Sequence, residues 1–188
     1  GEVVVNGMSP SRRDSRFANS GIVVAVDESD FKEYLKHGPL AGMYFQQSVE
    51  QLAWKLGGQK QSAPAQRLPD FVNRKVSHTL LETSYQPGLV SADMYQILPR
   101  QISETLREGL IAFDKKMKGY LTEEAQMVGV ESRTSSPVRI PRNKETWEHI
   151  QIKNLFPCGE GAGYAGGIVS AAMDGERCAE AVAIRIKR

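Results

Sequence analysis

The residues best suited to binding a charged ligand lie in the stretch 156–175, which is rich in glycine. Five glycines fall within nine positions: Gly159, Gly161, Gly163, Gly166 and Gly167. A phosphate needs several backbone N–H groups converging on it, and side chains obstruct that convergence, whereas glycine has none. A helix pattern of small and apolar residues follows at once, and its N-terminal end would add a partial positive charge. The spacing therefore predicts a phosphate site at a strand–turn–helix junction.

Two familiar phosphate-binding patterns do not describe this stretch. No Gly-Lys-Ser/Thr follows the glycines, so it is not a P-loop. It also lacks the acidic residue that ends a second strand about 20 positions after the glycines of a Rossmann fingerprint. Glu160 is expected to meet a ribose hydroxyl, a backbone N–H or a basic partner. The alternative is a tightly packed turn, in which glycine only allows a helix to approach a sheet closely.

A second candidate lies in the stretch 131–144, where basic and hydroxyl side chains gather. The basic residues are Arg133, Arg139, Arg142 and Lys144, and the hydroxyl residues are Ser132, Thr134, Ser135 and Ser136. Guanidinium forks make bidentate contacts to carboxylates and phosphates, so the stretch could hold an anionic substrate or a cofactor phosphate. A solvated loop between two strands, with salt bridges to an acidic helix surface, is the alternative.

The loop at residues 6–16 is a third candidate, because it follows a short run of valines typical of a strand. Asn6, Ser9 and Arg12 could direct polar groups into a site at the end of that strand. A β-turn with a basic surface explains the same residues equally well.

The two cysteines, Cys158 and Cys178, are not spaced as a metal site, so no metal is predicted. Without a disulfide framework, a reducing compartment such as the cytoplasm is expected. Cys158 lies near a predicted helix N-terminus, which could lower its thiol pKa, but a redox role would need a partner thiol or a flavin. The three histidines are scattered and form no nucleophile pattern, so no catalytic residue is predicted.

The composition is that of a globular chain with one domain or slightly more. It has 188 residues, 40% of them hydrophobic and 24% charged, with a net charge of +2. That charge is too small to indicate a nucleic-acid partner, and no apolar run approaches the roughly 20 residues that span a bilayer. The start carries neither a secretory signal nor an initiator Met, so a processed chain or a piece of a longer one is expected.

The elements that must position these residues follow from periodicity and from glycine and proline breaks. Helices are predicted at residues 39–57, 99–117 and 165–186, with a short one near 122–127. Strands are predicted at residues 3–5, 21–27, 128–131, 138–140 and 150–156. Residues 59–95, broken by prolines, are expected to be loop with short helical turns. The pattern indicates an α/β or α+β fold with a mixed sheet and about three main helices.

Residues 157–175 resemble the C-terminal flavin motif of the FAD-dependent dehydrogenases often described as uncharacterised NAD(FAD)-utilising dehydrogenases. Segments similar to the same family occur at residues 6–9, 19–20, 39–42, 63–67 and 131–140, so the resemblance covers nearly the whole chain. It implies a two-part flavoprotein. A discontinuous, Rossmann-like FAD-binding domain is interrupted by an inserted domain that covers the flavin ring.

One departure from the family is decisive. The N-terminal strand–Gly-x-Gly-x-x-Gly–helix, which binds the ADP half of FAD, has no counterpart in this sequence. The resemblance thus implies an inserted, substrate-covering domain at residues 1–145 and the last strand, turn and helix of the FAD domain at residues 146–188. The implied FAD contacts are Gly159, Glu160, Gly161, Gly166, Gly167 and Ile168. The candidates for the substrate or flavin-ring side are Arg133, Thr134, Asn6, Ser9 and Arg12.

The function implied is that of an FAD-dependent oxidoreductase. Hydride would pass between flavin N5 and either NAD(P) or a small organic substrate, with the missing FAD-binding segment as an intramolecular partner. The chain alone is expected to be inactive and not to hold FAD stoichiometrically. Two alternatives stay open: a non-catalytic substrate-recognition or interaction domain whose glycine turn is structural, and a nucleotide-binding module without flavin.

Overall fold

The computed structural model describes residues 1–7, 11–133 and 135–187, so Ser9 and Thr134 lie outside the described residues. The chain forms two compact units. The sheet unit comprises Gly1–Glu33 and Tyr44–Ser132, and the C-terminal unit comprises Tyr34–Met43 and Arg133–Arg188. The predicted division at residues 145 and 146 stays a prediction.

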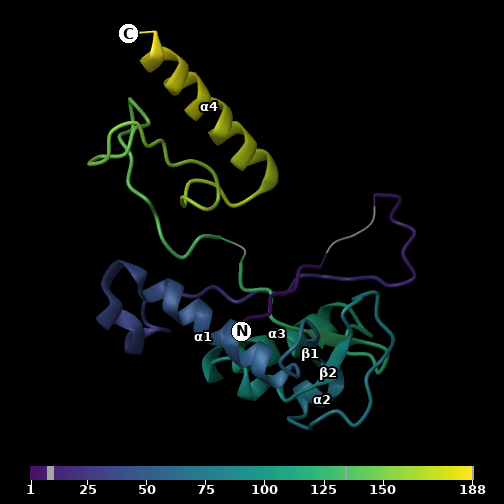
Figure 1. Cartoon of the computed structure of the whole chain (residues 1–188). Helices are drawn as coiled ribbons and strands as arrows, with labels where there is room; N and C mark the ends of the chain where they lie inside the picture. The colour runs from purple at the N-terminus through teal and green to yellow at the C-terminus, as the bar shows by residue number, and fades with distance from the viewer. Residues whose placement is uncertain (8–10, 134, 188) are drawn as a thin grey trace. The chain divides into compact units, whose positions relative to one another are not determined.

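Helices and short strands alternate along the sheet unit, and one long helix ends the C-terminal unit (Figure 1). The order is η1 (Lys32–Leu40), α1 (Ala41–Leu56), β1 (Ala63–Arg67), α2 (Leu68–Val72), β2 (Leu89–Ser91), η2 (Met94–Gln96), α3 (Arg100–Lys116), β3 (Gln126–Val128) and α4 (Ile168–Ile186). The fold is thus mixed α+β. The three long predicted helices are confirmed as α1, α3 and α4. None of the helices in the described part of the chain has the length and hydrophobicity needed to cross a membrane.

The sheet is small and mixed, with strand order β2-β1-β3. Strand β1 runs parallel to β2, where Ala63 faces Leu89, and antiparallel to β3, where Ala65 faces Val128. The expectation of loop at residues 59–95 was therefore wrong for β1 and β2. The expectation rested on Pro64, because proline has no N–H to donate to a neighbouring strand and is rare in a central strand. Its carbonyl nevertheless accepts a hydrogen bond from the Gly129 amide at 3.0 Å.

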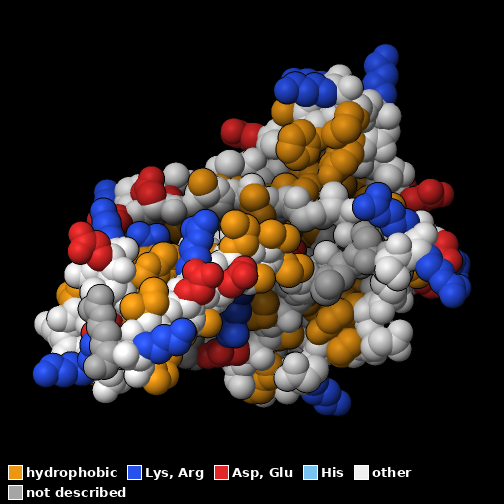
Figure 2. Space-filling model, turned by 90° about the horizontal axis from the view of Figure 1, so that it is seen from above, with side chains coloured by type: hydrophobic (Ala, Val, Ile, Leu, Met, Phe, Trp, Pro, Cys, Tyr) orange, Lys and Arg blue, Asp and Glu red, His pale blue; other side chains and the backbone are white. Residues whose placement is uncertain are grey.

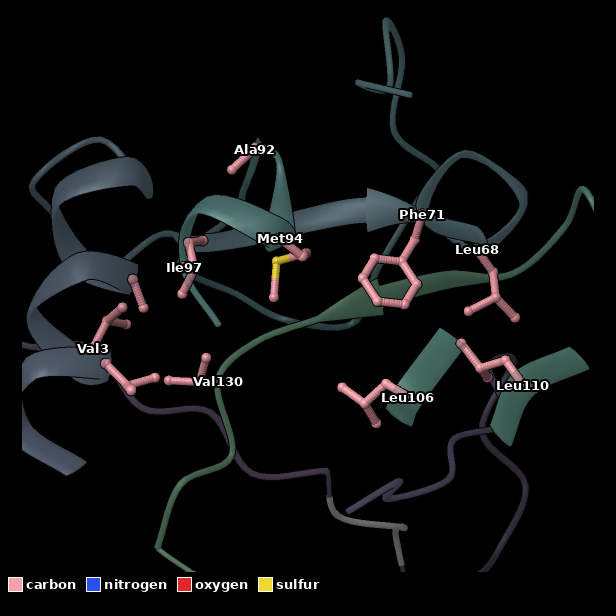
Figure 3. Close-up of a cluster of buried hydrophobic side chains, with 11 residues drawn as sticks. Val3, Leu68, Phe71, Ala92, Met94, Ile97, Leu106, Leu110 and Val130 are labelled. Atoms are coloured by element: carbon pink, nitrogen blue, oxygen red, sulfur yellow. The ribbon is translucent and has the colours of Figure 1, made fainter. Parts of the chain in front are cut away.

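The core of the sheet unit lies between the sheet and the helices, as Figure 3 shows. Phe71 is fully buried and stacks on Tyr95 with ring centroids 5.0 Å apart. Leu106 and Leu110 lie one helical turn apart on α3, and both are buried in the same cluster. Helical spacing also puts Phe113 and Met117 on this face, but they are 37% and 52% exposed, so only part of the face is buried.

Four of the predicted strands do not form, and the segments pack without a ladder. In the stretch 21–27, Ile22 and Val24 pack against the core while Val23 is 66% exposed, so the inward–outward alternation is present without a paired neighbour. Residues 3–5 make two isolated bonds, from Val3 N to Glu50 O and from Val5 N to Val130 O. The segments at 138–140 and 150–156 are also irregular. A strand needs a partner as well as a pattern.

One further prediction was wrong, and local hydrogen bonds explain the absence of the strand at 150–156. Residues 122–127 form no helix, because the chain extends there into β3. In the stretch 150–156 the backbone curls around His149 instead of extending. His149 Nδ1 accepts hydrogen bonds from the amides of Gln151 and Ile152 at 3.0 Å, and His149 N donates to Leu155 O at 2.7 Å. These local bonds replace the strand expected ahead of the turn.

Candidate functional site

The glycine-rich turn of the C-terminal unit is anchored to α4 by one ion pair. Arg142 Nη2 lies 2.7 Å from Asp174 Oδ1, and Arg142 Nη1 lies 2.9 Å from Asp174 Oδ2. The same Oδ2 accepts the Gly159 amide at 2.9 Å, and Nη1 also donates to the Pro157 carbonyl at 2.8 Å. One carboxylate and one guanidinium therefore join the stretch 157–159 to the second turn of α4.

Two aromatic rings enclose the Arg142 guanidinium. Its central carbon lies 3.6 Å from the ring centroid of Tyr164 and 4.0 Å from that of Trp147. The Tyr164 hydroxyl accepts the Arg142 amide at 3.0 Å and donates to the Ile140 carbonyl at 3.0 Å. Cation–π contacts of a desolvated guanidinium are among the stronger ones, so these rings stabilise Arg142 in its place.

The ion pair shifts the pKa of both partners. The hydrogen bonds from Arg142 hold the pKa of Asp174 below its ordinary value, although burial opposes them. The hydrogen bonds to Asp174 likewise raise the pKa of Arg142. The two side chains are 8% and 11% exposed, so a charge left without its partner there would be poorly hydrated. Arg142 is thus committed to Asp174, and its sequence-based role as a ligand for an external anion is not supported.

Inside the turn, packing requires glycine at position 163. Gly163 has φ of 81°, and a Cβ built on it would lie 2.7 Å from the Val138 carbonyl oxygen. Its amide donates to Glu160 O at 2.9 Å, and its carbonyl accepts from Arg139 Nε at 2.9 Å. Arg139 therefore supports the turn from outside, and the alternative of a closely packed turn accounts for Gly163.

Packing does not account for Gly161 and Gly166. A Cβ built on either would meet nothing within 4 Å among the described residues, and neither has a φ in the left-handed region. Gly166 precedes the residue that caps α4, and it is exposed. The space that these two glycines leave open is the kind that lets a ligand approach the backbone closely.

The start of α4 offers backbone donors at the same place. Gly167 is the capping residue, and its amide donates to Ser170 Oγ at 3.1 Å. The first amides of a helix have no acceptor within the helix, and here they include those of Ile168 and Val169. Ile168 is 87% exposed and Val169 is 71% exposed. An anion at this end would meet N–H groups and the positive end of the helix dipole.

The structure places the predicted site residues in both units. The six predicted FAD contacts lie together, in the turn and at the first residue of α4. Arg133 belongs to the C-terminal unit, whereas Asn6 and Arg12 belong to the sheet unit, where both are exposed. Ser9 and Thr134 lie outside the described residues. The roles of all these residues stay predictions.

Two residues of this arrangement, Asp174 and Trp147, do not stand out in the sequence. Asp174 anchors the turn, but in the sequence it lies among small residues that suggest a closely packed helix face. An acidic residue on such a face is the sequence signal that could have identified it. A core or interface position would be the ordinary expectation for Trp147. It covers Arg142 because the turn at residues 143–148 folds back, with the Asn143 amide donating to Glu148 O at 2.8 Å.

Comparison with known proteins places the chain among flavin-related proteins. Residues 1–134 match the family described as "FAD-dependent protein, C-terminal domain-like". An uncharacterised protein of Clostridium beijerinckii is 48% identical over 182 residues, an alignment that covers 96% of this chain and 33% of the relative. The chain thus spans about a third of the length of that relative. The family match takes in well over half of the residues, so the chain belongs to the FAD-dependent protein, C-terminal domain-like family.

Proposed function

We propose that the chain is part of an FAD-dependent oxidoreductase, in which it supplies the substrate side and the C-terminal turn that contacts the flavin. The observation that carries this proposal is the open space at Gly161 and Gly166 beside the exposed start of α4. Packing among the described residues gives no reason for glycine at either position. Membership of an FAD-dependent family supplies the ligand class.

The residues at the turn fit the ribityl and pyrophosphate portion of FAD. Gly166, Gly167 and Ile168 carry their amides at the α4 N-terminus, although that of Gly167 already bonds to Ser170 Oγ. A pyrophosphate is the kind of anion that helix N-termini bind. Glu160 is exposed one residue before Gly161, and its carboxylate would accept a hydrogen bond from a sugar or ribityl hydroxyl. When bound, the flavin would supply the hydride-accepting N5.

The residues of this chain would position the cofactor rather than react with it. Asp174 and Arg142 keep the start of the turn against α4, and Gly163 closes the turn by its own hydrogen bond. Electrostatic positioning of this kind is the usual contribution of a protein to flavin chemistry. On the substrate side we assign Arg133, Thr134, Asn6, Ser9 and Arg12, with NAD(P)H or a small organic molecule as the hydride donor.

The adenosine half of the cofactor is assigned to a Gly-x-Gly-x-x-Gly unit in a longer protein. In that arrangement the sheet unit forms an insertion in a Rossmann-like domain, and the 188-residue chain alone holds FAD weakly. Titration of the chain with FAD, followed by flavin fluorescence, is expected to show no saturation at micromolar concentrations. Saturation there would contradict the division of the site but not the flavin function.

The flavin function itself is tested in the longer protein. We expect it to be yellow when purified, and Gly166→Val to lose most of the bound flavin, because a branched side chain would fill the space that the cofactor needs. Gly109→Val is the matched control, since a Cβ at Gly109 of α3 also meets nothing within 4 Å. A colourless protein that takes up no flavin on reconstitution would overturn the proposal, as would equal flavin retention by both variants.

A non-catalytic binding module is the second candidate, favoured by exposed apolar residues. Ile168, Val169 and Ile186 of α4 are each more than two-thirds exposed, at 87%, 71% and 79%. Hydrophobic side chains also gather in groups on the surface seen in Figure 2. Such residues are typical of protein interfaces. The reconstitution experiment separates the candidates, because a binding module would gain no flavin absorption in the longer protein.

A further inference from the structure

The two cysteines lie near each other where the glycine turn approaches α4. Cys178 lies inside α4 and is 4% exposed, whereas Cys158 is exposed. The Sγ atom of Cys178 lies 3.8 Å from the carbonyl oxygen of Pro157, the residue that precedes Cys158. Covalent geometry keeps the Cα atom of Cys158 within about 3 Å of that oxygen. The Cα atom of Cys158 therefore lies no more than about 7 Å from the Cys178 sulfur.

The two thiols differ in environment. Burial raises the pKa of the Cys178 thiol, and the neighbouring Cys158 thiol contributes in the same direction. The positive charge of Arg142 opposes this shift, with Nη1 3.4 Å from the Cys178 sulfur. Cys178 is thus a shielded thiol beside a cation, and Cys158 is the thiol that a solute can reach. Reactivity toward oxidants follows exposure as well as thiolate character.

We propose that Cys158 and Cys178 form a redox pair that a hydroperoxide converts into an intramolecular disulfide, with Cys158 attacking the oxidant and Cys178 resolving the product. The pairing goes beyond the flavin function and does not depend on it. It links the first residue after Pro157 to the middle of α4, two segments already joined through Arg142.

The chemistry balances in two steps. The Cys158 thiolate attacks a peroxide oxygen, the O–O bond breaks, and the leaving oxygen takes a proton to become water or an alcohol, which leaves Cys158 as a sulfenic acid. The Cys178 sulfur then attacks the Cys158 sulfur, the S–O bond breaks, and the departing hydroxide takes the Cys178 proton to form a second water. Two thiols are oxidised and one peroxide is reduced by two electrons. Exchange with a dithiol reductant reverses the product.

Arg142 is placed to assist the second step. Its guanidinium stabilises the negative charge that develops on the Cys178 sulfur as the proton leaves. It is held there by Asp174 and the rings of Tyr164 and Trp147, so it would not need to move. The disulfide would fix the start of the glycine turn to α4 by a covalent bond.

The test uses the 188-residue chain, which has no other cysteines. The reduced protein is treated with stoichiometric hydrogen peroxide, alkylated, and analysed by intact mass and tryptic peptide mapping. We expect both thiols to disappear together, the mass to fall by that of two hydrogens, and one peptide pair to contain Cys158 linked to Cys178. A chain in which Cys158 becomes a sulfinic acid with no linkage, or in which disulfides form only between chains, would overturn the proposal.

Two variants and one denatured control define the roles. In Cys178→Ala, the Cys158 sulfenic acid should persist and react with dimedone; in Cys158→Ser, the remaining thiol should be oxidised at least about tenfold more slowly than Cys158. Circular dichroism checks that each variant folds. Cys158→Ser is expected to perturb the fold less than Cys178→Ala, because Cys158 is exposed and Cys178 is buried. If the chain in urea closes the same disulfide as fast as the folded chain, the fold does not bring the thiols together and the proposal fails.

Discussion

Arg142 and Asp174 form a two-pronged ion pair, with Nη2 2.7 Å from Oδ1 and Nη1 2.9 Å from Oδ2, in a place where both side chains are nearly buried. The pair satisfies the Gly159 amide and the Pro157 carbonyl at the same time. The conformation of the glycine turn therefore depends on Asp174, which lies about one and a half helical turns after the start of α4.

Asp174→Asn should destabilise the C-terminal unit by about 3 kcal/mol, because it leaves the Arg142 charge buried without its counter-charge. Urea unfolding followed by Trp147 fluorescence, with Trp54 replaced by Phe, measures the change in that unit. The control is Arg185→Gln in the same unit, which breaks a more exposed ion pair with Glu148, whose Oε1 lies 3.2 Å from Arg185 Nη2. It should change the unfolding midpoint little, since exposed pairs contribute little. Equal effects of the two variants would contradict the importance of burial here.

Acid should weaken the same unit through Asp174. Its pKa in the folded chain lies below the ordinary value of 3.8, so the ion pair stabilises the fold fully above that value. The stabilisation is lost as the pH falls through the lower, folded pKa. Unfolding midpoints measured between pH 7 and pH 2 should fall at the acid end, and Asp174→Asn should remove part of that fall. The comparison with the variant isolates Asp174 from Asp27, whose pKa is also lowered, chiefly by a hydrogen bond with Ser29.

Gly163→Ala should destabilise the glycine turn by about 1–3 kcal/mol, because the backbone there is left-handed and has no room for a methyl group. A Cβ would lie 2.7 Å from Val138 O and 3.0 Å from Arg139 Cα. Gly161→Ala, two positions earlier, should leave the thermal midpoint nearly unchanged, since its Cβ meets nothing within 4 Å. Differential scanning calorimetry of the two variants measures both thermal midpoints. Similar decreases in the two midpoints would contradict the distinction between a packed Gly163 and an open Gly161.

Leu110→Ala should destabilise the sheet unit by about 3 kcal/mol, because it leaves a cavity between α3 and the sheet. Leu110 is 1% exposed, whereas Met117 just after α3 is 52% exposed, so Met117→Ala is the matched control and should cost little. Urea denaturation followed by circular dichroism gives the two free energies of unfolding. A small loss in Leu110→Ala would show that the cluster of Figure 3 can collapse around the missing side chain.

The strands show where a local pattern is insufficient. Residues 21–27 have the alternation of a strand and bury Ile22 and Val24, yet they pair with no neighbouring strand in the described structure. Strand β1 shows the reverse, since Pro64 argues against a strand that nevertheless occupies the centre of the sheet. The hydrogen bonds between strands join residues far apart in the chain. The sequence of one segment therefore does not determine whether a partner strand is available to it.

The sequence by itself determined the three long helices and the position of the glycine turn, because helical period and glycine spacing are properties of neighbouring residues. Only the tertiary structure decided which glycines packing requires, that Arg142 is committed to Asp174 rather than to an external anion, and that Cys178 lies beside the Pro157 carbonyl that precedes Cys158. Each of these depends on side chains distant in sequence, and their proximity follows from how the turn folds back on α4.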